Sequence, residues 1–135
     1  GHDGSMTTIH ANTPSDVVLR LEVMVQQAAD SQLPVASIHR QVASALDLIV
    51  QLNAEMLPDP RRPGERVRRR VISEIVEVVD VDAERGGLYL KPIFRRLPGA
   101  GLQPTGFLPG FIEELLDAGL DMDLFLNLSP RRLAS

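Results

Sequence analysis

Apolar side chains recur at helical spacing near the start of the chain. Val17 is followed by Leu21, Met24 and Ala28, at spacings of four, three and four residues. This spacing is typical of the buried face of an amphipathic helix. Thr13 and Asp16 have the spacing of a capping box, and Pro14 suits the first helical position. The pattern therefore predicts a helix that begins at Pro14 and ends near Asp30.

A second helix and a buried strand are predicted next. The helix opens at Pro34, and its apolar face carries Val35, Ile38, Val42 and Ala45. The apolar run Leu48 to Val50 follows without an intervening glycine or proline, and it is typical of a strand buried on both faces of a parallel sheet. Periodicity alone does not separate this run from further helix. Two helices before such a strand favour an α/β layer over a helical bundle.

Turn residues divide the middle of the chain. The stretch from Asn53 to Glu65 is predicted to be a loop because it holds Pro58, Pro60, Pro63 and Gly64. Val71 to Val81 is rich in Val and Ile with interleaved carboxylates, which predicts a long strand with one wetter face. Gly86-Gly87 is a tight-turn signal, and Leu88 to Leu90 predicts the return strand of a hairpin. Pro92 is expected to limit how far that strand pairs as a central strand.

The C-terminal part of the chain has a different composition. Residues 97–110 are rich in proline and glycine, which predicts a linker or an extended arm. Phe111, Leu115 and Ala118, at spacings of four and three, predict a short amphipathic helix that Gly119 ends. We therefore divide the chain into an α/β portion, residues 1–97, and a linker with a short helical tail, residues 98–135.

Composition narrows the class of protein. The 135 residues are 44% hydrophobic and 24% charged, so one soluble domain with an aliphatic core is expected. The net charge of −4 gives no reason to expect nucleic acid as a partner. Cysteine is absent, which excludes disulfides and thiolate metal sites and fits a cytoplasmic protein. No apolar run approaches the roughly 20 residues that a membrane helix needs.

The first candidate site lies in the opening residues, GHDGSMTTIHANTP. A polar loop leads into a predicted short strand over Thr7 to Ile9, which ends at His10 where the first helix begins. Ligands of open α/β sheets bind at such strand-to-helix edges, and the imidazoles of His2 and His10 could contact a phosphate or a metal-bound water. The alternative is that neither histidine binds a ligand: His2 is a mobile terminal residue, and His10 is a hydrogen-bonded histidine at the end of a strand. Spacing alone favours this alternative. A zinc site is not expected, because His39 is the only other histidine.

Two charged groups in the middle of the chain are interpreted as surface. The first is a run of arginines, Arg61, Arg62, Arg66, Arg68, Arg69 and Arg70. Such a run can contact phosphates or an acidic partner, but no aromatic residues are interleaved to stack bases, so a solvated loop and strand start is favoured. The second group consists of Glu74, Glu77, Asp80 and Asp82. Their spacing distributes them over both faces of a strand, so they do not form a catalytic acid/base pair.

Several segments together resemble one family of ATPases. GHDGSMTTIHANTP, followed by Arg20-Leu21-Glu22 and Met24, is similar to the histidine box and following helix of the type II/IV secretion ATPases, above all the CpaF kind that power Tad/Flp pilus assembly. The similarity continues in Leu33-Pro34, Ile38, residues 41–51, Arg69-Arg70-Val71, Ile75 and Glu77-Val78. The CpaF tail is resembled by residues 104–107, Pro109, Phe111, Leu115 and Gly119. The proline-rich stretch from Ala54 to Glu65 and residues 91–94 depart from the family pattern.

The resemblance implies the C-terminal part of a RecA-like P-loop ATPase domain. The full-length protein would then form a homo-hexamer, use ATP and Mg²⁺, and drive secretion or pilus machinery at the inner face of the cell membrane. In this family the histidine box faces the terminal phosphate, so the resemblance assigns His10 to sensing or positioning the γ-phosphate region, with His2 in support. The loop near the phosphates would comprise Gly1, Gly4, Ser5 and Thr8.

The resemblance also implies that two motifs of the family are absent from these 135 residues. The family's phosphate loop, GxxxxGK[ST], and its acidic Mg²⁺-binding box precede the histidine box, and both would lie upstream of Gly1. Without them phosphoryl transfer lacks its main stabilising groups, so this polypeptide alone is expected to be inactive and to hold no cofactor. The alternative is a non-catalytic α/β interaction module derived from such an ATPase. With part of the ATPase sheet missing, exposed strand edges are expected to promote self-association.

Overall fold

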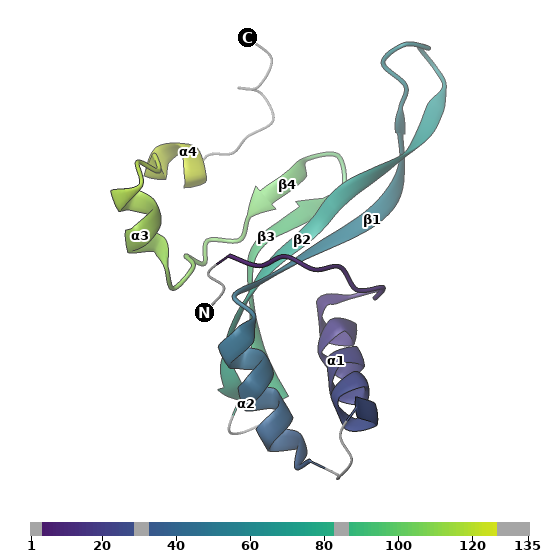
Figure 1. Ribbon diagram of the computed structural model, residues 1–135. Coiled ribbons are helices and arrows are strands. Elements are labelled where there is room, and N and C mark those ends of the chain that lie inside the picture. The colour runs from purple at the N-terminus through teal and green to yellow at the C-terminus, as the bar shows by residue number, and fades with distance from the viewer. Residues whose placement is uncertain (1–3, 29–32, 83–86, 127–135) are drawn as a thin grey trace.

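The computed structural model describes residues 4–28, 33–82 and 87–126 (Figure 1). In chain order the elements are α1 (Pro14–Ala28), α2 (Val35–Ala45), β1 (Leu48–Pro58), β2 (Arg66–Asp82), β3 (Gly87–Leu97), β4 (Gly101–Pro104), α3 (Ile112–Asp117) and α4 (Met122–Leu126). The strands form one antiparallel sheet in the order β1-β2-β3-β4. The expected α/β class with flanking helices, a β-hairpin and a helical tail is confirmed at this level. No helix among these residues is long and apolar enough to cross a membrane.

Helix α1 begins as its sequence predicts. The backbone N–H of Thr13 donates to Oδ2 of Asp16 (3.1 Å), and the backbone N–H of Asp16 donates to Oγ1 of Thr13 (3.2 Å). This reciprocal pair is a capping box, which satisfies two N–H groups at the helix start. The predicted apolar stripe is covered only in its first half, where Val17 and Leu21 pack in the core, whereas Met24 is exposed. The predicted end near Asp30 lies outside the described residues.

Helix α2 supplies the most deeply buried side chain. It begins at Val35, directly after Pro34, as expected. Ile38 has 0% of its surface exposed and Val42 on the same face is also buried, whereas Val35 and Ala45 at the helix ends are exposed. The centre of the predicted apolar face therefore provides the packing of this helix.

The sheet is antiparallel, which corrects the interpretation of residues 48–50. This run is neither further helix nor a strand of a parallel sheet; it opens β1, which pairs antiparallel with β2. Ile49 is 8% exposed, whereas Leu48 and Val50 are 40% and 50% exposed. Successive side chains of a strand point to opposite faces. Only the face of Ile49 is covered, because it packs with Val17 of α1 in the core.

The predicted strand over Thr7 to Ile9 does not form. A strand needs a neighbouring strand for its N–H and C=O groups, and residues 4–13 pair with no strand of the described sheet. Ile9 and Ala11 instead pack against the core, and Nε2 of Gln51 donates to the carbonyl oxygen of Ala11 (3.1 Å). This segment is therefore fixed by side chains rather than by a strand ladder.

Strands β1 and β2 form a long ribbon that extends past the rest of the sheet (Figure 1). Their pairing reaches Pro58 opposite Arg66, so the turn comprises only residues 59–65. The prediction of a loop from Asn53 is therefore wrong for residues 53–58. Pro58 ends its strand, and Pro60 and Pro63 lie in the turn, where no ladder N–H is required.

Strand β3 is central despite its proline. Val76 lies opposite Pro92 and Ile75 lies opposite Phe94, so Ile93 is an extra residue in a bulge. The bulge accommodates the missing N–H of Pro92, and β3 continues to Leu97, further than the sequence predicted. The predicted linker at 97–110 also contains a strand, because β4 pairs with residues 94–97 of β3.

An aromatic contact joins the C-terminal helix α4 to the sheet. Helix α3 ends as predicted at Gly119, whose φ is 93°. The N–H of Leu120 donates to the carbonyl of Leu115 (2.8 Å) and that of Gly119 to Leu116 (2.9 Å), which is a Schellman motif. The ring of Phe125 in α4 lies edge-on to that of Phe94 in β3, with centroids 5.1 Å apart.

Candidate functional site

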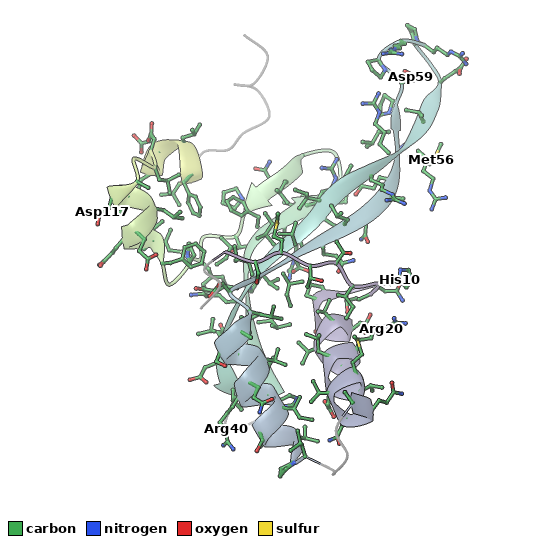
Figure 2. All side chains as sticks on the ribbon, in the orientation of Figure 1. His10, Arg20, Arg40, Met56, Asp59 and Asp117 are labelled. Carbon is green, nitrogen blue, oxygen red and sulfur yellow. The ribbon has the colours of Figure 1, made fainter. Side chains whose placement is uncertain are left out.

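The candidate site is an open hollow at the start of α1. It has a volume of about 330 Å³ and is lined by His10, Ala11, Asn12, Asp16, Leu19 and Arg20. Figure 2 shows His10 and Arg20 on the same side of the molecule, one from the segment before α1 and the other from α1 itself. The hollow therefore brings a predicted site residue next to a helix side chain that spacing had not assigned to any site.

The backbone around His10 is held on both sides. Ile9 before it and Ala11 after it pack against the core, and the Ala11 carbonyl accepts the hydrogen bond from Gln51. Three residues further on, Thr13 is fixed by the capping box. The side chain of His10 itself is exposed. This arrangement holds the main chain while leaving the imidazole free to meet a ligand.

The side chains of the hollow fit an anion. The guanidinium of Arg20 offers five N–H donors with a fixed positive charge, the Asn12 amide adds two donors, and His10 donates from at least one ring nitrogen. Asp16 contributes the carboxylate of the hollow, and its Oδ2 already accepts the N–H of Thr13. The start of α1 adds partial positive charge. Phosphate oxygens are acceptors that match this set of donors.

The remaining predicted site residues are not gathered at the hollow. Gly4, Ser5 and Thr8 are exposed, and none of them lines it. Gly1 and His2 lie outside the described residues. Sequence reasoning missed Asn12 and Arg20. Their signal was available, because Asn12 directly precedes the capping box and Arg20 follows Asp16 by one helical turn, on the same face.

His39 belongs to the packing of the two helices rather than to the hollow. It is buried in α2, and its Nε2 lies 3.3 Å from Oε2 of Glu22 in α1. The pair joins the helices by a hydrogen bond whose donor depends on the histidine tautomer. Nδ1 of His39 is buried and has no hydrogen-bond partner among the described residues.

One carboxylate that was interpreted as surface charge is buried. Glu77 is 7% exposed, accepts the backbone N–H of Gly110 at Oε1 (2.6 Å), and has Oε2 2.7 Å from Nζ of Lys91. The expectation of a solvated Glu77 is therefore wrong. Spacing could not reveal this, because Gly110 lies 33 residues away in the sequence. Glu74 pairs with the exposed Arg95 (2.8 Å), which is consistent with a position near solvent.

Comparison with known proteins assigns no family. No protein-family model matches the chain, and no curated protein matches it either. Within residues 4–28, 33–82 and 87–126, no group of three or more histidine or acidic side chains is arranged to hold a metal ion.

Proposed function

We propose that this chain is the C-terminal part of an ATP-hydrolysing motor of type II/IV secretion or Tad/Flp pilus assembly, to which it contributes the histidine box. The observation that carries the proposal is the convergence of His10, Asn12 and Arg20 on one hollow at the start of α1. This donor set suits phosphate oxygens, and His10 is the residue that the family resemblance assigns to the terminal phosphate.

The proposal gives each residue of the box a role. ATP supplies the phosphoryl group, and Mg²⁺ neutralises phosphate charge, when both are bound. His10 donates a hydrogen bond to the γ-phosphate region and Arg20 adds a fixed positive charge beside it. The family resemblance assigns His2 to the support of His10, and Gly1, Gly4, Ser5 and Thr8 to the loop near the phosphates. The RecA-like origin of the domain belongs to this proposal as well.

The chain by itself is proposed to be inactive. Its 135 residues contain no GxxxxGK[ST] segment. The coding sequence upstream of Gly1 tests the proposal. A GxxxxGK[ST] segment in frame would support it, whereas a start codon with no such segment would favour the alternative, a non-catalytic α/β interaction module. ATP turnover by the purified 135-residue chain, shown to be free of contaminating ATPase, would contradict the proposed inactivity.

Self-assembly is the second part of the proposal. The full-length protein is taken to be a homo-hexamer, in the cytoplasm and peripheral to the inner face of the membrane, where it meets secretion or pilus machinery. Strand β1 supports self-association of this portion, because it lies at a sheet edge and exposes Leu48, Val50 and Leu52. Unprotected edges of this length pair readily with other chains.

A further inference from the structure

One end of the molecule carries a concentrated positive charge. We call residues 59–70, the turn and the first part of β2, the arginine ribbon. Its only carboxylates are Asp59 and Glu65, and its arginines, all exposed, are Arg61, Arg62, Arg66, Arg68, Arg69 and Arg70. Of these arginines, only Arg62 forms an ion pair with a described residue, Glu65 (3.3 Å). Strand alternation places Arg68 and Arg70 on one face of the ribbon and Arg69 on the other.

The C-terminal helices carry the opposite charge. We call residues 112–123, which hold α3 and the start of α4, the acidic tail. It has no Lys, Arg or His, and its carboxylates, all exposed, are Glu113, Glu114, Asp117, Asp121 and Asp123. None of them forms an ion pair with the described residues. Asp121 accepts the backbone N–H groups of Asp123 and Leu124 at the start of α4, which are hydrogen bonds to neutral groups and not ion pairs.

The two surfaces lie apart in one molecule. Figure 2 shows Asp59 at the tip of the arginine ribbon and Asp117 on the acidic tail at opposite sides of the sheet. Each surface also exposes apolar side chains beside its charges: Met56 is 50% exposed next to the ribbon, and Leu116 and Leu124 are 41% and 54% exposed on the tail side. A mixture of apolar and charged groups is typical of protein interfaces.

We propose that the arginine ribbon of one copy docks on the acidic tail of a second copy. The occupant follows from charge complementarity, because the surface that matches the ribbon is on the same chain. The net charge of −4 and the exposed carboxylates of the tail oppose a polyanion such as nucleic acid or an anionic membrane. Complementary charge favours the correct partner and penalises like-charged ones.

This contact joins unlike surfaces of two copies. A pair that makes both ribbon–tail contacts closes as a two-fold dimer, whereas a pair that makes only one keeps a free ribbon and a free tail, so further copies can add to form a ring or a filament. The inference shares with the proposed function only the expectation that copies assemble. It needs neither ATP nor the hollow at His10.

Analytical ultracentrifugation of the full 135-residue chain tests the inference through charge reversal. The ribbon variant is R68E/R69E/R70E, and the tail variant is E113R/E114R/D117R. The wild type should self-associate at about 0.05 M NaCl and much less at about 0.5 M, where the screening length is shorter. Each variant alone should associate at least about tenfold more weakly than the wild type.

Mixing the two variants is the decisive arm. In an equimolar mixture, the acidic ribbon of the ribbon variant can bind the basic tail of the tail variant. The basic ribbon of the tail variant can likewise bind the acidic tail of the ribbon variant. Association should therefore return to within a few-fold of the wild type. Recovery also demonstrates that both variants are folded. The matched control is R131Q/R132Q, which removes two arginines outside the ribbon and should not weaken association. A monomeric wild type at low salt overturns the inference, as does a mixture that stays monomeric.

The same variants distinguish self-association from binding of the ribbon to another kind of partner. If the ribbon variant loses binding to duplex DNA or to vesicles of anionic phospholipid while self-association is unchanged, the ribbon serves that partner and the inference is wrong. The ribbon variant keeps the hollow at His10 unchanged, so a loss of its self-association does not bear on the proposed function. Failure of the charge test likewise leaves the role of His10 unaffected.

Discussion

Nζ of Lys91 lies 2.7 Å from Oε2 of Glu77, and 19% and 9% of the two side chains are exposed. Lys91 is the one lysine in the sequence. Because Oε1 of Glu77 accepts the N–H of Gly110, this ion pair joins β2, β3 and the segment before α3 at a single point. The pair is therefore a structural link between the sheet and the C-terminal helices.

Replacing Lys91 should destabilise the fold. Lys91→Met leaves the Glu77 carboxylate buried without its cation, which should lower the free energy of unfolding by about 2–4 kcal/mol. Urea denaturation measures the change. The matched control is Arg62→Met, which breaks the exposed pair with Glu65 and should cost less than about 0.5 kcal/mol. The double variant E77Q/K91M removes both charges and should recover much of the loss. Equal effects at Lys91 and Arg62 would contradict the assignment.

Gly110 should not tolerate a side chain. A Cβ at this position would lie 2.9 Å from Oε1 of Glu77, closer than real Cβ contacts. Gly110→Ala must therefore displace the Glu77 carboxylate, and we expect a loss of about 1–3 kcal/mol. Gly87→Ala is the control, because nothing lies within 4 Å of its Cβ position. Thermal unfolding should leave Gly87→Ala close to the wild type. A Gly110→Ala protein as stable as the wild type would show that the carboxylate is not fixed there.

The capping box should contribute measurably to stability. Thr13→Ala removes Oγ1, the acceptor for the Asp16 N–H, and should cost about 1 kcal/mol. Ser15→Ala, an exposed neighbour in the first turn of α1, should change stability by less than about 0.5 kcal/mol. Urea midpoints of the two variants provide the comparison. Equal losses in Ser15→Ala and Thr13→Ala would contradict a capping role for the Thr13 hydroxyl.

Ile38 should be the most sensitive core position of α2. It is fully buried, so Ile38→Ala leaves a cavity and should cost about 2–5 kcal/mol. Val35 on the same helix is 41% exposed, and Val35→Ala should cost well under half as much. The two unfolding free energies, measured by urea denaturation, test whether α2 packs on the sheet through its centre. Similar losses at both positions would argue against this packing.

Local patterns predicted the helices well. The starts of α1 and α2, the capping box of Thr13 and Asp16, and the end of α3 at Gly119 depend on a few neighbouring residues, so the sequence contains their physical cause. The antiparallel pairing of β2 with β3 was predicted in the same way from their apolar and β-branched residues, whereas Gly86 of the predicted turn lies outside the described residues.

Pairing and burial were harder to predict, because they depend on distant residues. The β-branched run at residues 48–50 is compatible with parallel or antiparallel neighbours, and only β2 decides between them. Pro92 predicted that its strand would pair only over a short length, but a bulge at Ile93 allows β3 to continue pairing beyond the proline. Glu77 was misjudged for the same reason, since its cation and its N–H donor come from other segments. At the candidate site, the family resemblance rather than spacing selected His10. That Arg20 lines the same hollow could not be predicted, because it requires the position of α1 relative to the preceding segment.

Under the proposed function, the steady-state ATPase rate of the full-length protein tests the central claim most directly. His10→Ala should lower kcat by at least about tenfold, because in the proposed function His10 donates to the γ-phosphate region. Arg40→Ala, an exposed arginine of α2 away from the hollow, should leave kcat within about twofold of the wild type. A His10→Ala protein that hydrolyses ATP as fast as the wild type would contradict the account.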